Sequence, residues 1–331
     1  MDFDLTGVQA AWREKGAALG RDVAPDPAAA SVVQGAARAG LLDPAVDLLA
    51  LVVAVEALAQ HSPAAAVTLA LHAGTSLGLA RLREGSGEAG LARFAPLFRG
   101  EAVAAVGLSS DDIPREAEGR LSGRASWAAP LTDRGIVVVS PKGDAGRTAY
   151  AVALEMPGVG VERIATAALP GLVCGHVTFA GVRGEPIGAT VPIMIRIRIL
   201  MAAAGLGMGK RALREALATA KAAHAAAAGE QTVQGLLADA ATELDAAMLM
   251  TWKAAAADPL SLSDASLAKL MATAAAQRAV ERATQVVGVD SFQRGHIIER
   301  LAQDVRALEL FAGRTEALRA AVAEEILPRR A

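Results

Sequence analysis

The side chains best suited to metal binding or nucleophilic catalysis are few and widely spaced along the 331 residues of this chain. The histidines are His61, His72, His176, His224 and His296. Structural zinc sites usually pair ligands about two to five residues apart, and no two of these histidines lie so close. Cys174 is the only cysteine, which excludes an internal disulfide and any site with several thiolates. We therefore expect solvated or hydrogen-bonded histidines and no metal centre.

Overall charge and motif content exclude further classes of function. The formal net charge is −2 and the isoelectric point is about 6.2, so the chain lacks the basic balance of a protein that binds nucleic acid. It contains neither the G-x-G-x-x-G nor the G-x-x-x-x-G-K motif of nucleotide-binding loops. The segment Met1–Trp12 is acidic and amphipathic, unlike an export signal. With a single cysteine, these features predict a cytoplasmic protein.

The composition predicts a mostly helical protein. Hydrophobic residues make up 53% of the chain but aromatic residues only 3%, so alanine, leucine and valine must fill the core, which favours closely packed helices. The most apolar stretch, Ala64–Leu79, is shorter than the ~20 residues of a membrane span and contains His72. We expect a buried core helix there and no membrane as a partner.

Residues 1–99 and 100–190 differ in periodicity. In the first stretch, apolar residues such as Leu48, Leu51 and Val55 recur three and four apart, which predicts an N-terminal helical domain. The second stretch contains short runs rich in valine and glycine, several of which alternate between apolar and polar positions, and predicts a middle β domain. The predicted strands span residues 102–109, 120–127, 135–140, 150–155, 158–164 and 175–182. The segment Pro141–Asp144 is predicted as a turn.

Residues 191–331 return to helical spacing and predict a C-terminal four-helix bundle. The expected helices span residues 192–228, 232–256 and 263–287, followed by a pair of helices separated at Gly313. Ser263 or Asp264 is the expected N-cap of the third helix. Small residues leave one surface of the first helix smooth, so that a neighbouring backbone can approach closely; they are Ala202, Ala203, Gly205, Gly207 and Gly209. The predicted fold class is α+β, mostly α, with a small β-barrel or sheet between two helical domains.

Four segments, in the same order along the chain, resemble motifs of the acyl-CoA dehydrogenase family. Glu299–Glu316 resembles the pattern E-R-x-x-R-D-A-R-x-x-x-I-Y-E-G-T-x-E, and Leu121–Trp127 resembles the strand L-x-G-x-K-x-W. Leu236–Leu244 is similar to the helix K-L-A-D-M-A-T-E-L, and Arg198–Gly209 is similar to the helix that opens the C-terminal bundle. The resemblance implies an FAD-dependent desaturation of an acyl-CoA thioester, in which a carboxylate removes a proton beside the thioester.

That carboxylate is missing from both positions where members of the family carry it. Ala312 occupies the usual glutamate position, and the alternative position, directly before Arg198, holds Ile197. A well-placed base contributes ~10²- to 10⁴-fold to a rate, so its loss changes the expected activity. Glu309 and Glu316 are the nearest carboxylates in sequence, but neither aligns with the base.

The resemblance also implies the residues that contact FAD, and several of them depart from the family pattern. The implied contacts are Ser109, Trp127, Gln231, Gln285 and Gly288. Trp127 can stack near the flavin or simply cover the β domain. The R-x-x-x-F-G stretch is shortened at residues 222–230 and has lost its cation, and Asp290 would place a negative charge near a diphosphate. FAD binding is therefore expected to be weak or shared with a partner subunit.

The implied substrate-binding residues surround the interruption in the last helical stretch. They are Arg198, Gly313 and Arg314. In the family the backbone N–H of the residue at position 312 donates to the thioester oxygen, and a backbone donor survives the change of glutamate to alanine. Arg196 and Arg198 point to different helix faces, so one of them can approach a CoA phosphate, or both can be solvated.

Three functions remain open at this point. The preferred one is a subunit without its own base that works with an active partner, similar to the base-less subunits of heteromeric actinobacterial acyl-CoA dehydrogenases. The second is a self-sufficient dehydrogenase with a relocated base, and the third is a non-redox acyl-CoA-binding protein of the same fold. The expected partners are an acyl-CoA thioester, another dehydrogenase subunit in a homo- or hetero-oligomer, and, for an active enzyme, an electron-transfer flavoprotein.

Overall fold

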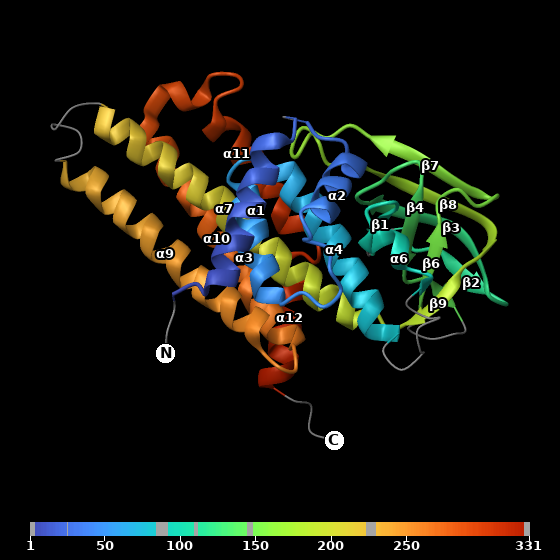
Figure 1. The fold of residues 1–331 in the computed structure, drawn as a ribbon. Helices are drawn as coiled ribbons and strands as arrows, with labels where there is room; N and C mark the ends of the chain where they lie inside the picture. Colours follow the sequence, from blue (N-terminus) through green and yellow to red (C-terminus); the bar gives the residue numbers. More distant parts are fainter. Residues whose placement is uncertain are drawn as a thin grey trace.

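The computed structural model describes residues 4–24, 26–83, 92–108, 112–143, 148–222 and 230–327. Within these residues the chain forms helices, then strands, then helices again. Figure 1 shows the strands gathered at one end of the molecule and helices from both halves of the chain packed side by side at the other. This arrangement confirms the predicted fold class, with a small β unit between two helical units.

The N-terminal helical unit is built around a deeply buried helix. Its helices are α1 (Gly7–Asp22), α2 (Ala29–Arg38), α3 (Leu48–Ala59), α4 (Pro63–Arg83) and α6 (Ala95–Phe98). α1 begins with a capping box, in which Thr6 and Gln9 each accept a hydrogen bond from the other's backbone N–H. α4 is long and apolar enough to cross a membrane, but 94% of its apolar window is buried inside the protein. This burial confirms the predicted core helix at residues 64–79.

The middle unit consists of two sheets that enclose a small core of their own. Its strands are β1 (Val103–Gly107), β2 (Arg115–Ala117), β3 (Arg120–Ala128), β4 (Gly135–Val139), β5 (Lys142–Gly143), β6 (Ala149–Ala153), β7 (Val159–Ile164), β8 (Cys174–Arg183) and β9 (Glu185–Gly188). The sheet orders are β1-β4-β6-β9 and β5-β2-β3-β8-β7. Val177 and Phe179 on β8 are buried and Thr178 between them is exposed, which confirms the predicted alternation.

Three short strands, β2, β5 and β9, were not predicted from the sequence. The segment predicted as a turn contributes β5 instead, because the N–H of Lys142 donates to the carbonyl of Pro114 at 2.9 Å and β5 pairs with β2. Asp144, the last residue of that segment, lies outside the described residues. Strands of two to four residues carry too few alternating positions to stand out from a loop.

The C-terminal unit contains the predicted bundle. Its elements are α7 (Val191–Ala222), α9 (Gln231–Ala256), α10 (Leu262–Val287), the 3₁₀ helix η1 (Gly288–Phe292), α11 (Ile297–Leu310) and α12 (Thr315–Ile326). The predicted N-cap of α10 is wrong. Ser261 has the extended backbone of a cap, and its hydroxyl accepts the N–H groups of Ser263 (3.1 Å) and Asp264 (3.2 Å). The two residues predicted as caps therefore belong to the first turn of the helix.

Glycines on α7 let two other helices, α3 and α10, approach its backbone closely. A Cβ atom on Gly207 would lie 2.2 Å from the carbonyl oxygen of Glu56 on α3, and one on Gly209 would lie 3.1 Å from the Cα of Ala276 on α10. Neither distance leaves room for a side chain, which confirms the predicted smooth surface. α7 is consequently the central helix that joins the N-terminal helices to the bundle.

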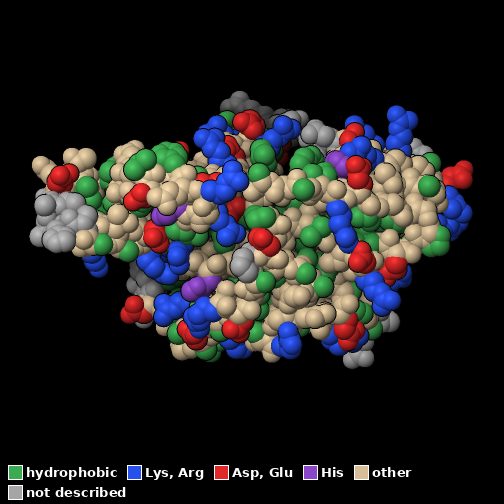
Figure 2. Space-filling view, turned by 90° about the horizontal axis from the view of Figure 1, so that it is seen from above, with side chains coloured by type: hydrophobic (Ala, Val, Ile, Leu, Met, Phe, Trp, Pro, Cys, Tyr) green, Lys and Arg blue, Asp and Glu red, His purple; other side chains and the backbone are tan. Residues whose placement is uncertain are grey.

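Charged side chains of both signs are interspersed on one face of the molecule. Figure 2 shows basic and acidic groups side by side on the face that it presents, with no large region of one sign. The near-neutral formal charge of the whole chain agrees with this distribution.

Candidate active site

The break between α11 and α12 has a backbone conformation that side chains rarely adopt. α11 ends at Leu310 and α12 begins at Thr315. Between them Ala312 has a φ of +58° and Gly313 a φ of +112°. Glycine accepts such angles freely, whereas a left-handed alanine costs about 1–2 kcal/mol unless its surroundings hold it. The break is therefore a defined turn that neighbouring helices must stabilise.

Arg198 of α7 holds the first carbonyl of this turn. Its Nε donates to the carbonyl oxygen of Ala312 at 3.1 Å, and its Nη1 donates to the hydroxyl of Ser266 on α10 at 2.8 Å. The residue is only 8% exposed, and burial lowers the pKa of its guanidinium. The structure thus brings together Arg198 and Gly313, two of the residues that the sequence predicts as substrate-binding.

Lys269 of α10 holds the next carbonyl. Its side chain is completely buried, and its Nζ donates to the carbonyl oxygen of Gly313 at 2.7 Å. Burial, and secondly the charge of Arg198, lower the pKa of this ammonium to about 7, while Glu309 partly opposes the shift. Lys269 was not predicted from the sequence. The available signal was a lysine placed among small, buried residues of the same helix, such as Ala265, Ala268 and Ala272.

Glu309 and Glu316, the carboxylates nearest to Ala312 in sequence, have different surroundings. Glu309 accepts hydrogen bonds at both oxygens, from Thr315 Oγ1 at 3.0 Å and from Gln277 Nε2 at 3.3 Å. Glu316 is exposed in the first turn of α12. Ile197, in the alternative base position, is fully buried against α4, where a Cβ on Gly74 would lie 2.7 Å from its Cγ1.

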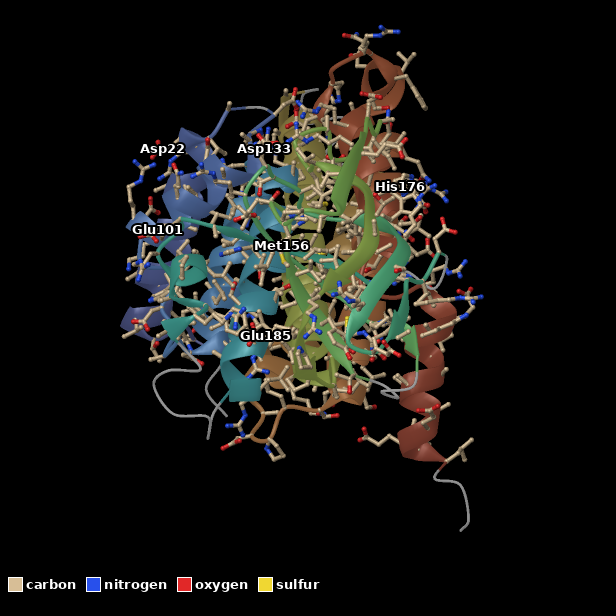
Figure 3. All side chains as sticks on the ribbon, turned by 90° about the vertical axis from the view of Figure 1, so that its right-hand side faces the viewer. Asp22, Glu101, Asp133, Met156, His176 and Glu185 are labelled. Carbon is tan, nitrogen blue, oxygen red and sulfur yellow. The ribbon has the colours of Figure 1, made fainter. Side chains whose placement is uncertain are left out.

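A second feature of the site is an exposed tryptophan at the end of β3. Trp127 has a φ of +56° and is 50% exposed. The ring of His176 on β8 meets it edge-on, with centroids 6.2 Å apart and an interplanar angle of 72°. Figure 3, which views the β unit end-on, shows His176 on the side of the molecule that carries the C-terminal helices. The indole therefore presents an aromatic surface that its own fold leaves partly uncovered.

The remaining predicted cofactor residues are far from Trp127 within one chain. Gln231 is exposed at the start of α9, Gln285 is exposed near the end of α10, and Gly288 opens η1. Figure 1 places these helix ends at the end of the bundle remote from the β unit. Ser109 lies outside the described residues, as do residues 223–229. One chain therefore does not bring the predicted FAD residues together.

The positions of Arg314 and Arg196 bear on two further predictions about the site. Arg314 occupies the N-cap position of α12, is exposed, and makes no capping hydrogen bond with its side chain. Arg196 donates to the carbonyl of Pro192 at 3.0 Å and, as expected, does not share the contacts of Arg198. Within the described residues, no group of three or more His, Cys, Asp or Glu side chains could hold a metal ion.

Solved structures with the same arrangement of units define the class of fold. Butyryl-CoA dehydrogenase from Megasphaera elsdenii matches with a TM-score of 0.84 and 19% identity, over 99% of this chain and 100% of that one. PigA with FAD and proline matches with a TM-score of 0.87 and 20% identity, over the full length of both chains. The fold is therefore that of the acyl-CoA dehydrogenases.

Sequence comparisons agree with the fold. The family model "Acyl-CoA dehydrogenase, C-terminal domain" matches residues 194–327. The human mitochondrial short-chain specific acyl-CoA dehydrogenase is 27% identical over 85% of this chain and 76% of its own length. The Bacillus subtilis protein "Probable acyl-CoA dehydrogenase YngJ" is 32% identical over 39% of this chain, a match that spans only 36% of that protein. Residues 194–327 of this chain thus match the C-terminal domain of the acyl-CoA dehydrogenase family, and the chain as a whole has the fold of these enzymes.

Proposed function

We propose that this chain is a flavoprotein subunit that binds an acyl-CoA thioester at the α11–α12 break and supports α,β-desaturation only together with an active partner subunit that supplies the base. The observation that carries this proposal is a turn whose carbonyls are held by Arg198 and Lys269, beside a position where alanine replaces the carboxylate. The site retains the means to bind a thioester but not the means to take its proton.

The turn itself can bind the thioester oxygen. Within the described part of the chain, the backbone N–H of Ala312 makes no hydrogen bond to another backbone group. A preorganised N–H donor stabilises negative charge that develops on a carbonyl oxygen when the adjacent C–H bond weakens. Desaturation removes a proton from the α-carbon and a hydride from the β-carbon, and FAD supplies the hydride acceptor when it is bound.

The residues of this chain fit the ring system of a flavin in part. Trp127 offers a half-exposed aromatic surface, fixed at one edge by His176, and planar ring systems pack favourably on such surfaces. The solved PigA structure with FAD, which shares this fold, supports the choice of cofactor. Gln231, Gln285 and Gly288 fit the same cofactor only when a second subunit brings its own bundle end to the β unit. We therefore propose an oligomer with FAD at the contact between subunits.

The geometry favours the partner-dependent enzyme over a relocated base. A carboxylate that served as the base would need a free oxygen directed at the substrate, whereas both oxygens of Glu309 accept hydrogen bonds from the protein. Glu316 follows Gly313 in the sequence, in the first turn of α12, and its side chain is exposed to solvent. Electrons from an active assembly would pass to an electron-transfer flavoprotein.

Expression of the chain alone and together with a complete acyl-CoA dehydrogenase from the same organism tests the proposal. We expect a chain that is colourless or weakly yellow by itself, and a yellow complex that bleaches when an acyl-CoA is added. A lone chain that bleaches with acyl-CoA would show a self-sufficient enzyme. A chain that binds acyl-CoA but gains no flavin with any partner would show a non-redox binding protein.

A further inference from the structure

The turn at Ala312–Gly313 is held by two buried basic side chains that form no ion pair with a carboxylate among the described residues. Lys269 is completely buried, and among the described residues its hydrogen-bond partner is the Gly313 carbonyl. Arg198 contacts the Ala312 carbonyl and the Ser266 hydroxyl. A buried charge without an opposite charge beside it destabilises the fold, because its lost hydration is not replaced. A lysine at this position therefore needs an explanation other than stability.

The two cations act on consecutive peptide groups. In a trans peptide the C=O and the following N–H point in opposite directions. Arg198, on the carbonyl of Ala312, fixes the peptide plane between residues 312 and 313, and Lys269, on the carbonyl of Gly313, fixes the next plane. With both planes held, the conformation of Gly313 is fixed. The peptide group that carries the Ala312 N–H is then confined between the plane held by Arg198 and the last hydrogen bond of α11, from the Phe311 N–H to the Ala307 carbonyl at 3.4 Å.

We propose that Lys269 is a positioning residue for the thioester site, which, with Arg198, keeps the Ala312 N–H directed at the thioester oxygen. This inference rests on the proposed function. Charge-assisted hydrogen bonds are about twice as strong as neutral ones. Because the pKa of Lys269 is about 7, this residue holds the turn most firmly below that pH, where it is an ammonium. A donor that is fixed before the ligand arrives costs no reorganisation when it binds. The buried lysine is thus explained by the precision with which it helps to hold the backbone donor at Ala312.

The spectrum of a bound conjugated thioester tests this role directly. An arylacryloyl-CoA absorbs at longer wavelength when its carbonyl oxygen is polarised by hydrogen bonds, and the position of the band does not depend on how tightly the ligand binds. We expect the wild-type chain to shift the band to longer wavelength and Lys269→Met to retain less than about half of that shift at saturation. Lys210→Met is the matched control, because Lys210 pairs with Glu56 at 2.6 Å on α3 and does not contact the turn. A full wild-type shift in Lys269→Met would overturn the proposal.

Amide hydrogen exchange of the ligand-free chain separates this proposal from the proposed function. In Lys269→Met, we expect the peptide that contains residues 308–318 to exchange about tenfold faster than in the wild type, and no such change in Lys210→Met. If the wild type shifts no thioester band, the proposed function fails, and the exchange result alone decides whether Lys269 holds the turn. Unchanged exchange of this peptide in Lys269→Met would then refute the role of Lys269.

If Lys269→Met does not fold, Ser266→Ala replaces it, since this change removes one of the two contacts of Arg198. A smaller band shift and faster exchange are expected, and wild-type values would overturn the proposal.

Discussion

The Nδ1 atom of His72 accepts the backbone N–H of Ala104 at 3.0 Å, and its Nε2 donates to the carbonyl of Leu97 at 3.1 Å. His72 lies on the core helix α4, while Leu97 lies in α6 and Ala104 in β1. An imidazole that accepts at one nitrogen and donates at the other must be neutral. The junction between the first helical unit and the β unit therefore depends on a neutral histidine.

This junction predicts a loss of stability in mild acid. Complete burial lowers the pKa of His72 from 6.5 to about 4. The unfolded chain takes up a proton at this residue near pH 6.5 and the folded chain does not, so the stabilisation is fully present above pH 6.5 and is lost as the pH falls toward 4. The loss amounts to about 3 kcal/mol. Urea unfolding at a series of pH values measures it.

His72→Gln isolates the contribution of this residue. A glutamine offers one acceptor and one donor without titrating, so we expect the free energy of unfolding of this variant to change less than that of the wild type between pH 7 and pH 4. His296, an N-cap on the partly exposed end of α11, provides the control substitution His296→Asn. Equal pH dependence in the wild type and His72→Gln would show that His72 is not responsible.

Asp304 on α11 predicts a loss of stability as the pH rises, opposite to the pH dependence that His72 predicts. Its Oδ1 accepts the N–H of Leu169 at 2.6 Å, and burial raises the pKa of its carboxyl to about 6, against 3.8 for a free aspartate. Because the folded state favours the protonated form, the contribution is stabilising below pH 3.8 and is lost as the pH rises through 6. Asp304→Asn keeps the acceptor and removes the charge. We expect it to raise the free energy of unfolding by about 1–3 kcal/mol at pH 8 and by little at pH 4. Asp245→Asn, on the exposed face of α9, should leave the free energy of unfolding unchanged at both pH values.

Placing a carboxylate at Ala312 tests whether the site lacks only its base. Residue 312 already has a Cβ atom at a φ of +58°, so Ala312→Glu adds no new backbone strain. We expect Ala312→Glu, with bound flavin, to increase the rate of flavin bleaching by acyl-CoA at least about 10²-fold over the wild type. Ala312→Gln, which has the same shape but cannot accept the proton, should remain at the wild-type rate. If flavin is bound and both variants match the wild type, residue 312 does not face the α-carbon.

The sequence reveals the units of this protein better than the contacts of its site. Helical periodicity and Gly313 predict the bundle and the break, because both depend on local pattern. Lys269 contacts a residue 44 positions away, and its role follows only from the way α10 packs on α11 and α12. The left-handed conformation of Ala312 could not be predicted either, since alanine ordinarily favours a helix and the contact of Arg198 with its carbonyl joins residues 114 positions apart. Ser261, the true cap of α10, was missed because three neighbouring residues can all serve as caps.

The close approach of α3 to α7 gives a final prediction with an internal control. A Cβ on Gly207 would lie 2.2 Å from the carbonyl oxygen of Glu56, so Gly207→Ala must push two helix backbones apart. We expect it to lower the free energy of unfolding by about 3 kcal/mol, at the upper end of the usual cost of overpacking.

Gly235, in the exposed part of α9, would carry a Cβ with nothing within 4 Å. The same substitution there should raise the free energy of unfolding by about 0.5–1 kcal/mol, because alanine is the better helix former. Urea unfolding of the two variants compares them directly. Since both changes add one methyl group to a helix, the difference in sign isolates the contact between α3 and α7. A Gly207→Ala variant as stable as Gly235→Ala would mean that these two helices do not approach as closely as the glycine allows.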